Sequence, residues 1–200
     1  HGLSDDQLKR FVDLGVTFSV APENEMIQGH GHPITGQLLR LGSAPSLGVD
    51  LESVLSGDMP TVARMALSHQ RALDNAAHRA AHGTIPNTST ITTRQALAWI
   101  TVEGARMLKM EDRIGTLTPG KQAALVLIRA DDLNMWPVHD PVSAVIMQAS
   151  VANVDSVMIA GTWRKRGGRL LFDDLQRVKN ELQASGQRII EELGLSPRAA

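Results

Sequence analysis

Asp50 is the carboxylate whose place in the sequence most favours chemistry. It directly follows the apolar run Ser46 to Val49, which is typical of a buried strand. In parallel α/β folds reactive groups gather at the carboxyl ends of strands, so Asp50 could belong to a reaction site there. The sequence also fits a simpler interpretation, in which Asp50 only caps the following turn.

Two polar residues follow a second strand pattern and could share a pocket with Asp50. The β-branched run Val16 to Val20 ends at Pro22, and Glu23 and Asn24 come next in a loop. Parallel strands place their carboxyl ends at one edge of a sheet. We therefore expect Glu23 and Asn24 near Asp50, where they either line the same pocket or solvate the loop.

The most conspicuous imidazoles are His30 and His32, which are separated by one glycine. Because the chain has no cysteine, imidazole and carboxylate groups are its only candidate ligands for a transition metal. Gly31 and Pro33 predict a loop, in which these histidines either line a cleft or act directly. A further alternative treats His30, His32 and Asp50 as one complete site.

The remaining histidines of interest carry weaker patterns. His78 and His82 have the i, i+4 spacing of metalloprotease helices, but Arg79 stands where those enzymes have a glutamate. A solvated helix face is therefore the better interpretation. His69 and His139 belong to no pattern and are interpreted as structural.

The segments that must position these residues alternate between helix and strand. Ser4 and Gln7 form a capping-box pattern before a helix that ends near Gly15. A short helix is expected over 35–41, between the two strand patterns. This order predicts an α/β fold with parallel strands.

Longer helices are expected in the middle and at the end of the chain. An alanine-rich segment predicts one helix over 59–82 with Pro60 in its first turn, and another helix is expected over 92–108. An amphipathic helix is expected over 173–193.

The periodicity changes from helical to alternating after Met110, which predicts a small β unit. The sequence thus divides into an α/β region over 1–109, a small β domain over 110–172 and a C-terminal helix over 173–200. A strand and turn are expected over 114–121, and strands are expected over 123–128, 154–159 and 162–165.

Composition excludes several classes of function. Lys plus Arg number 20 against 21 Asp plus Glu, giving a net charge of −1, so we expect neither nucleic acid nor an anionic membrane as a partner. No apolar run approaches the roughly 18 residues of a membrane span. The 42% hydrophobic content and the lack of cysteine fit a soluble, cytoplasmic protein. The chain starts at His1 without an initiator Met, so we expect a processed start or a piece of a longer protein.

The chain resembles the C-terminal half of an amidohydrolase-superfamily enzyme, in the branch of cytosine-deaminase-like and triazine (ATZ/TRZ) hydrolases. The Gly-x-Leu-x-Pro-Gly-Lys-x-Ala turn is fairly specific for the small β domain of these enzymes. The resemblance runs through His1-Gly2, Pro22-Glu23-Asn24, Leu47-Gly48-Val49-Asp50, Ile114 to Ala123 and Val157 to Gly161.

The resemblance implies strands six to eight of a distorted (β/α)8 metallo-hydrolase barrel, part of a small β-sandwich and a C-terminal helix. It implies one catalytic divalent metal, with zinc as the first choice and iron or manganese as alternatives. Asp50 matches the carboxylate that binds the metal and takes a proton from the attacking water, and His1 matches a catalytic histidine. Glu23, Asn24 and His30 fall in a loop that implies substrate binding.

The activity implied is metal-dependent hydrolysis of a carbon–nitrogen bond, of the deaminase or chlorohydrolase kind, in a small cyclic substrate. The family's other metal ligands would precede residue 1, and a catalytic zinc normally has three protein donors. We therefore expect the 200-residue chain alone to be inactive. The alternative is a non-catalytic scaffold that keeps part of the barrel for binding or oligomerisation.

Three strands of an eight-stranded barrel would leave unpaired parallel edges. We expect them to expose the apolar faces of Phe18, Val20, Leu47 and Val49. Either the missing N-terminal half or a second copy of the chain is then expected to cover the edges.

Overall fold

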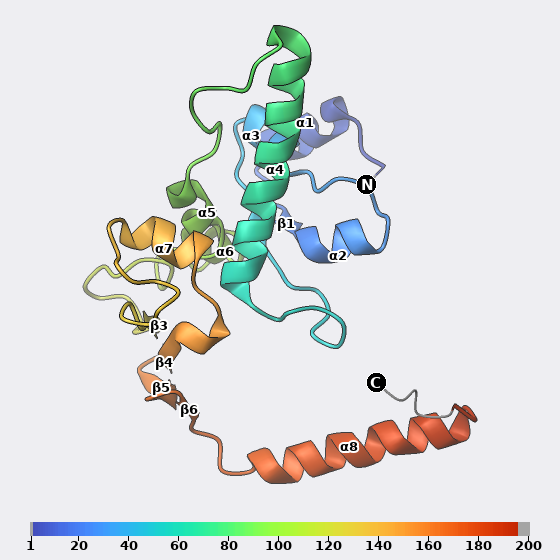
Figure 1. Ribbon diagram of the computed structural model, residues 1–200, viewed down its shortest axis with the longest axis vertical. Helices are drawn as coiled ribbons and strands as arrows, with labels where there is room; N and C mark the ends of the chain where they lie inside the picture. The colour runs from blue at the N-terminus through green and yellow to red at the C-terminus, as the bar shows by residue number, and fades with distance from the viewer. Residues whose placement is uncertain (1, 196–200) are drawn as a thin grey trace.

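The computed structural model describes residues 2–195, which form a mixed α/β fold (Figure 1). Its first part alternates helix and strand as the sequence predicts. The elements are α1 (Asp5–Asp13), β1 (Ser19–Val20), α2 (Pro22–Ile27), α3 (Thr35–Arg40), β2 (Ser46–Leu47) and α4 (Met59–His82).

Helix α4 is the central element, and it begins and ends at the residues that the sequence predicts. Asp58 caps its N-terminus by accepting a hydrogen bond from the backbone N–H of Thr61 at 3.4 Å, and Pro60 lies in the first turn. Gly83 ends the helix with a φ of 72°, a left-handed conformation that favours glycine.

Strands β1 and β2 pair in parallel, with Ser19 opposite Ser46 and Val20 opposite Leu47. Parallel pairing confirms the prediction, although each strand has only two residues. These are the two parallel strands within residues 2–195, and the antiparallel strands lie in a separate sheet.

The expected exposure of the apolar strand face is wrong. Val20 and Leu47 are buried, and Phe18 and Val49 are partly buried against the same core. Helix α4 covers this face with small and medium apolar side chains, which lets the sheet approach closely. The core consists of Val20, Leu38, Leu47, Val62, Ala63, Ala66, Leu67, Ile91, Ala96, Trp99 and Ile146.

Two corrections concern helices. The segment 92–108 is not one helix but two, α5 (Thr93–Trp99) and α6 (Val102–Met107). At the break, the Thr101 hydroxyl donates to the carbonyl of Leu97 at 2.7 Å, a side-chain bond that competes with continued helix. Glu23 and Asn24, expected in a loop, lie in the short helix α2, which begins at Pro22.

The second part of the chain contains a four-stranded antiparallel sheet in the order β3-β4-β5-β6. The expected strand over 114–121 is absent, because turns at Gly115 and Gly120, with φ of 90° and 92°, occupy that segment. Helix α7 (Pro141–Met147), which the sequence did not indicate, packs against α4 and α5. The strands are β3 (Leu125–Ile128), β4 (Val154–Ile159), β5 (Thr162–Arg166) and β6 (Arg169–Leu170).

The C-terminal helix α8 (Leu175–Glu192) forms where it is predicted but contributes no buried residue to the fold. Figure 1 shows it apart from the main body, beyond β6. Its apolar residues stay in solvent, with Leu182 73% exposed. No helix within residues 2–195 is both long enough and apolar enough to span a membrane.

The loop between α2 and α3 is attached to α4 by two histidines. Nδ1 of His32 lies 2.9 Å from Nε2 of His69, and the two ring centroids are 5.1 Å apart. Nδ1 of His69 is buried and has no hydrogen-bond partner among residues 2–195. The pKa of His69 is below its ordinary value of 6.5, first because of burial and second because of the charge of His32, while Glu25 opposes the shift.

The core predicts a large cost for truncation of Leu67 in α4. We expect Leu67→Ala to lower the free energy of unfolding by about 2–5 kcal/mol, because it leaves a cavity among buried neighbours. The matched control Leu182→Ala on exposed α8 is expected to change it by less than about 0.5 kcal/mol. Urea denaturation followed by circular dichroism measures both, and equal losses would contradict the proposed core.

The histidine contact predicts a pH-dependent stability. Because the pKa of His69 is lowered in the folded chain, the unfolded chain binds more protons at this position once the pH falls below about 6.5. The stabilisation is present above that pH and is lost as the pH falls through 6.5 toward the lowered pKa. We expect His69→Gln to flatten the fall in unfolding free energy between pH 7 and pH 5. If the unfolding free energies of the original protein and of His69→Gln, measured by urea denaturation, fall equally steeply over this pH range, His69 contributes nothing to the pH dependence.

Candidate functional site

Asp50 lies at the carboxyl end of β2, three residues after Leu47, in an unusual backbone conformation. Its φ is 71°, in the left-handed region that few residues other than glycine adopt. The Asp50 side chain is exposed among residues 2–195, and its Oδ2 accepts a short hydrogen bond from Nδ2 of Asn24. A strained, accessible carboxylate with one defined donor is a feature that occurs often at functional sites.

Asn24 presents its side-chain amide to Asp50 from the first turn of α2. The residue is only 4% exposed, so its polar atoms depend on partners within the protein. Its Oδ1 accepts a hydrogen bond of 2.8 Å from Nε2 of Gln28, one helical turn later. Gln28, Asn24 and Asp50 thus form a continuous chain of hydrogen bonds.

A second contact joins α2 to the loop that follows Asp50. Oε2 of Glu23 accepts a hydrogen bond from the Ser56 hydroxyl at 3.1 Å. The neighbouring Glu25 turns back and accepts from the backbone N–H of Ala21 at 2.8 Å. The structure therefore brings Glu23 and Asn24 to the segment that carries Asp50, as the two strand ends predict.

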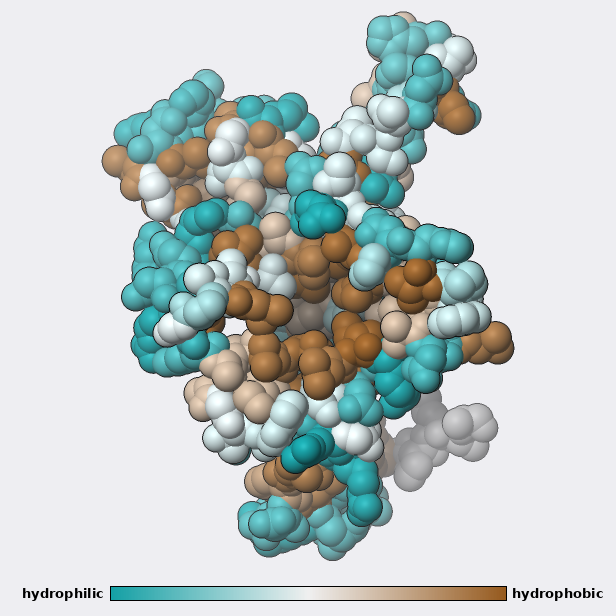
Figure 2. Space-filling view, turned by 90° about the vertical axis from the view of Figure 1, so that its left-hand side faces the viewer, coloured by the Kyte–Doolittle hydropathy of each residue, from teal (hydrophilic) through white to brown (hydrophobic). Residues whose placement is uncertain are grey.

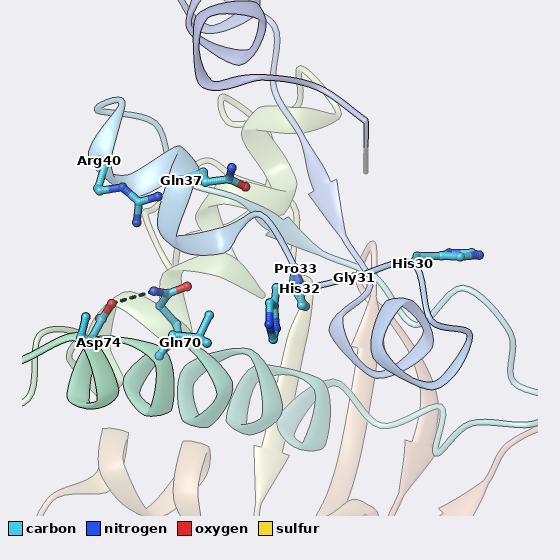
Figure 3. Close-up of a pocket in the computed structure, with 10 residues that line it drawn as sticks. His30, Gly31, His32, Pro33, Gln37, Arg40, Gln70 and Asp74 are labelled. Carbon is cyan, nitrogen blue, oxygen red and sulfur yellow. Dashed lines mark hydrogen bonds between the residues drawn. The ribbon is translucent and has the colours of Figure 1, made fainter. Parts of the chain in front are cut away.

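His30 lies on the other side of α2 from this contact, at the start of a separate groove (Figure 3). Its backbone N–H donates to the carbonyl of Glu25 at 2.9 Å. In Figure 3 its ring points away from that of His32, which turns toward α4. His1, the other catalytic candidate, lies outside the described residues.

The groove has a volume of about 480 Å³ between the loop after α2, helix α3 and the middle of α4. Gln70 and Asp74 form part of its wall and share a hydrogen bond of 2.7 Å. The sequence did not indicate that His69 contacts His32 of the groove wall, since the two histidines are 37 positions apart. The groove is lined by His30, Gly31, His32, Pro33, Gln37, Arg40, Gln70, Leu73, Asp74 and Ala77.

The described part of the chain does not assemble a metal site by itself. Among residues 2–195 no group of three or more histidine, aspartate or glutamate side chains is arranged to hold an ion. The alternative in which His30, His32 and Asp50 form one complete site therefore lacks its geometry. Asp50 offers one carboxylate, and a catalytic zinc normally needs three protein donors.

Comparison with curated proteins gives relatives that cover almost the whole chain. The model of the amidohydrolase family matches residues 6–164. The 8-oxoguanine deaminase of Pseudomonas aeruginosa is 33% identical over 95% of this chain and 40% of its own length. A 5-methylthioadenosine/S-adenosylhomocysteine deaminase of Desulforudis audaxviator is 29% identical over 96% of this chain and 42% of its own length.

Solved structures agree with these relatives in fold. An adenosine deaminase from Xanthomonas campestris with bound zinc has a TM-score of 0.79 at 26% identity, over 93% of this chain and 40% of its own. Atrazine chlorohydrolase from Arthrobacter aurescens TC1, complexed with zinc, has a TM-score of 0.67 at 24% identity, over 91% of this chain and 38% of its own. At 24% identity, the likeness to atrazine chlorohydrolase concerns the fold alone.

The chain spans about 40% of the length of these relatives and matches them over more than nine-tenths of its own. The family match over residues 6–164 includes α2, β2 and Asp50, and extends into β5. The chain therefore belongs to the amidohydrolase family.

Proposed function

We propose that this chain contributes the Asp50 portion of an active centre that hydrolyses a carbon–nitrogen bond in a small nitrogen heterocycle. The observation that carries the proposal is the exposed Asp50 carboxylate at the end of β2, held by the amide of buried Asn24. Family membership supports hydrolysis as the class of reaction. The deaminase names of the relatives support an amino-substituted ring as the substrate class.

In this reaction Asp50 moves one proton. Water forms a bond from its oxygen to the ring carbon, and Asp50 accepts the proton that the water loses. The electron pair of the breaking carbon–nitrogen bond goes to nitrogen, which takes that proton from Asp50 as the amine leaves. An exposed carboxylate fixed by a single donor suits this role, because its second oxygen stays available to the water.

The divalent metal implied by the family does not fit the described residues alone, because within residues 2–195 Asp50 belongs to no group of three or more histidine, aspartate or glutamate side chains that could hold an ion. We infer that the other donors lie outside residues 2–195, together with any role of His1. The zinc bound in the adenosine deaminase structure, which is 26% identical to this chain, supports zinc as the ion.

Two surfaces support the inference that further polypeptide completes the centre. The β1–β2 sheet has two strands, so each carries an edge with unpaired backbone groups. Figure 2 shows a face of the molecule on which apolar side chains gather around a hollow. Uncovered apolar surface of this kind marks contacts with other protein segments. We propose that additional strands of a (β/α)8 barrel cover these edges.

Asp50→Asn tests the proposed reaction. In the full protein encoded by the gene, we expect this change to lower kcat for ammonia release from amino-purines and amino-triazines by about 10²–10⁴-fold, because the amide cannot accept the proton. The matched control Asp173→Asn changes an exposed carboxylate beyond β6 and is expected to keep full activity. Ammonia release and zinc content measured on the same samples check both.

Two outcomes would contradict the proposal. Unchanged activity of the Asp50→Asn protein would remove Asp50 from the reaction. A full protein that binds no zinc and hydrolyses none of these substrates would favour the non-catalytic scaffold.

A further inference from the structure

We propose that Asn24 is a positioning residue for Asp50, and that Gln28 fixes the direction in which the Asn24 amide points. The inference rests on the proposed function, since it concerns how the reacting carboxylate is oriented. It also changes the role expected for Asn24, from contact with the substrate to support of Asp50. The hydrogen bonds from Gln28 to Asn24 and from Asn24 to Asp50 carry it.

The direction of an asparagine amide is decided by what lies at each end. Gln28 donates an N–H group to the Asn24 oxygen at 2.8 Å, which favours the Asn24 oxygen at that end. The Asn24 NH₂ group must then face Asp50, whose carboxylate can only accept. A reversed amide would place the Asn24 oxygen against the Asp50 oxygen and its NH₂ group against that of Gln28.

Burial makes Asn24 suited to this task. At 4% exposure its amide has almost no access to water, so a lost protein partner is not replaced at low cost. The same burial leaves little surface for a substrate to contact. Its oxygen and one of its two N–H groups are already used within the protein.

Asp50 needs an external support because its own segment offers little. It is exposed, and its φ of 71° is a conformation that costs free energy for a residue with a side chain. The Asn24 amide is the side-chain partner of Asp50 within residues 2–195, and it comes from a helix 26 positions earlier. Helix α2, through Asn24, therefore restricts the rotation of the Asp50 carboxylate, which the loop after β2 would leave free.

Gln28 differs from Asn24 in being exposed, which gives the inference a distinctive test. In Gln28→Ala, water can replace the lost donor, so we expect kcat to fall by less than about 10-fold. In Gln28→Glu the introduced carboxylate only accepts, so it favours the reversed Asn24 amide and turns the Asn24 oxygen toward Asp50. We expect kcat to fall further, by about 10–100-fold.

The kinetic experiment uses the full protein with an amino-purine substrate. We expect Asn24→Ala to lower kcat by about 10–100-fold while KM stays within about twofold, because the substrate does not touch this amide. Gln187→Glu is the matched control: Gln187 is an exposed glutamine on α8 that also bonds one helical turn away, to Glu191 at 2.9 Å. It is expected to leave kcat unchanged.

A spectroscopic measurement tests the same contacts without activity. The side-chain NH₂ signals of Asn24 in a ¹⁵N–¹H correlation spectrum are expected to shift in Asp50→Ala and in Gln28→Glu, and to stay in place in Gln187→Glu. Signals of Asn24 that do not respond to Asp50→Ala would overturn the inference.

The outcomes separate this inference from the proposed function. If Asp50→Asn abolishes hydrolysis but Asn24→Ala and Gln28→Glu leave kcat unchanged, the positioning role is wrong and the function stands. A rise in KM without a fall in kcat would return Asn24 to substrate contact. If Asp50→Asn has no effect on hydrolysis, the proposed function fails, whatever the NH₂ signals show.

Discussion

Burial of one face of a very short sheet against α4 is the constraint on which this structure depends. Strands β1 and β2 contain two residues each, and their backbone hydrogen bonds alone could not hold them. Val20 and Leu47 are instead buried in one core with Ala63 and Ala66 of α4, and both α4 and α6 contact β2. Because the sheet is fixed in this way, the residues that follow each strand, Asp50 among them, emerge at a defined place. The candidate site is thus positioned by apolar packing and completed by polar contacts.

Local patterns in the sequence predicted the elements well where the chain carries its own boundary signals. The capping box at Ser4, the Asp58 cap and the glycine at position 83 each act within one helical turn. The sequence therefore gives α1 and α4 accurately, and the two parallel strands with their polar ends. The break at Thr101 was missed because it depends on a side-chain hydrogen bond that helical periodicity does not indicate. Helix α7 was missed because its stability comes from packing on α4 and α5.

The proximity of Glu23 and Asn24 to Asp50 was predictable from the sequence, but the contacts that connect them and the place of His30 in a separate groove were not. Two strand ends in a parallel arrangement place Glu23 and Asn24 near Asp50, and the structure has them there. The donor that Asn24 directs to Asp50, and the contact between His32 and His69, join residues 26 and 37 positions apart. No local pattern encodes such distances, because they follow from how α2, α3 and α4 pack. The sequence likewise indicates which faces of the strands are apolar, but it does not show which helix covers those faces.

Residues 28–32, between α2 and α3, make side-chain contacts at both ends. Gln28 holds the amide of Asn24 at one end, and His32 meets His69 of α4 at the other, four residues later. His32 lines the groove, and the hydrogen bond of Gln28 leads through Asn24 to Asp50. The wall of the groove and the support of the carboxylate therefore share one stretch of backbone, so neither could be redesigned without regard to the other.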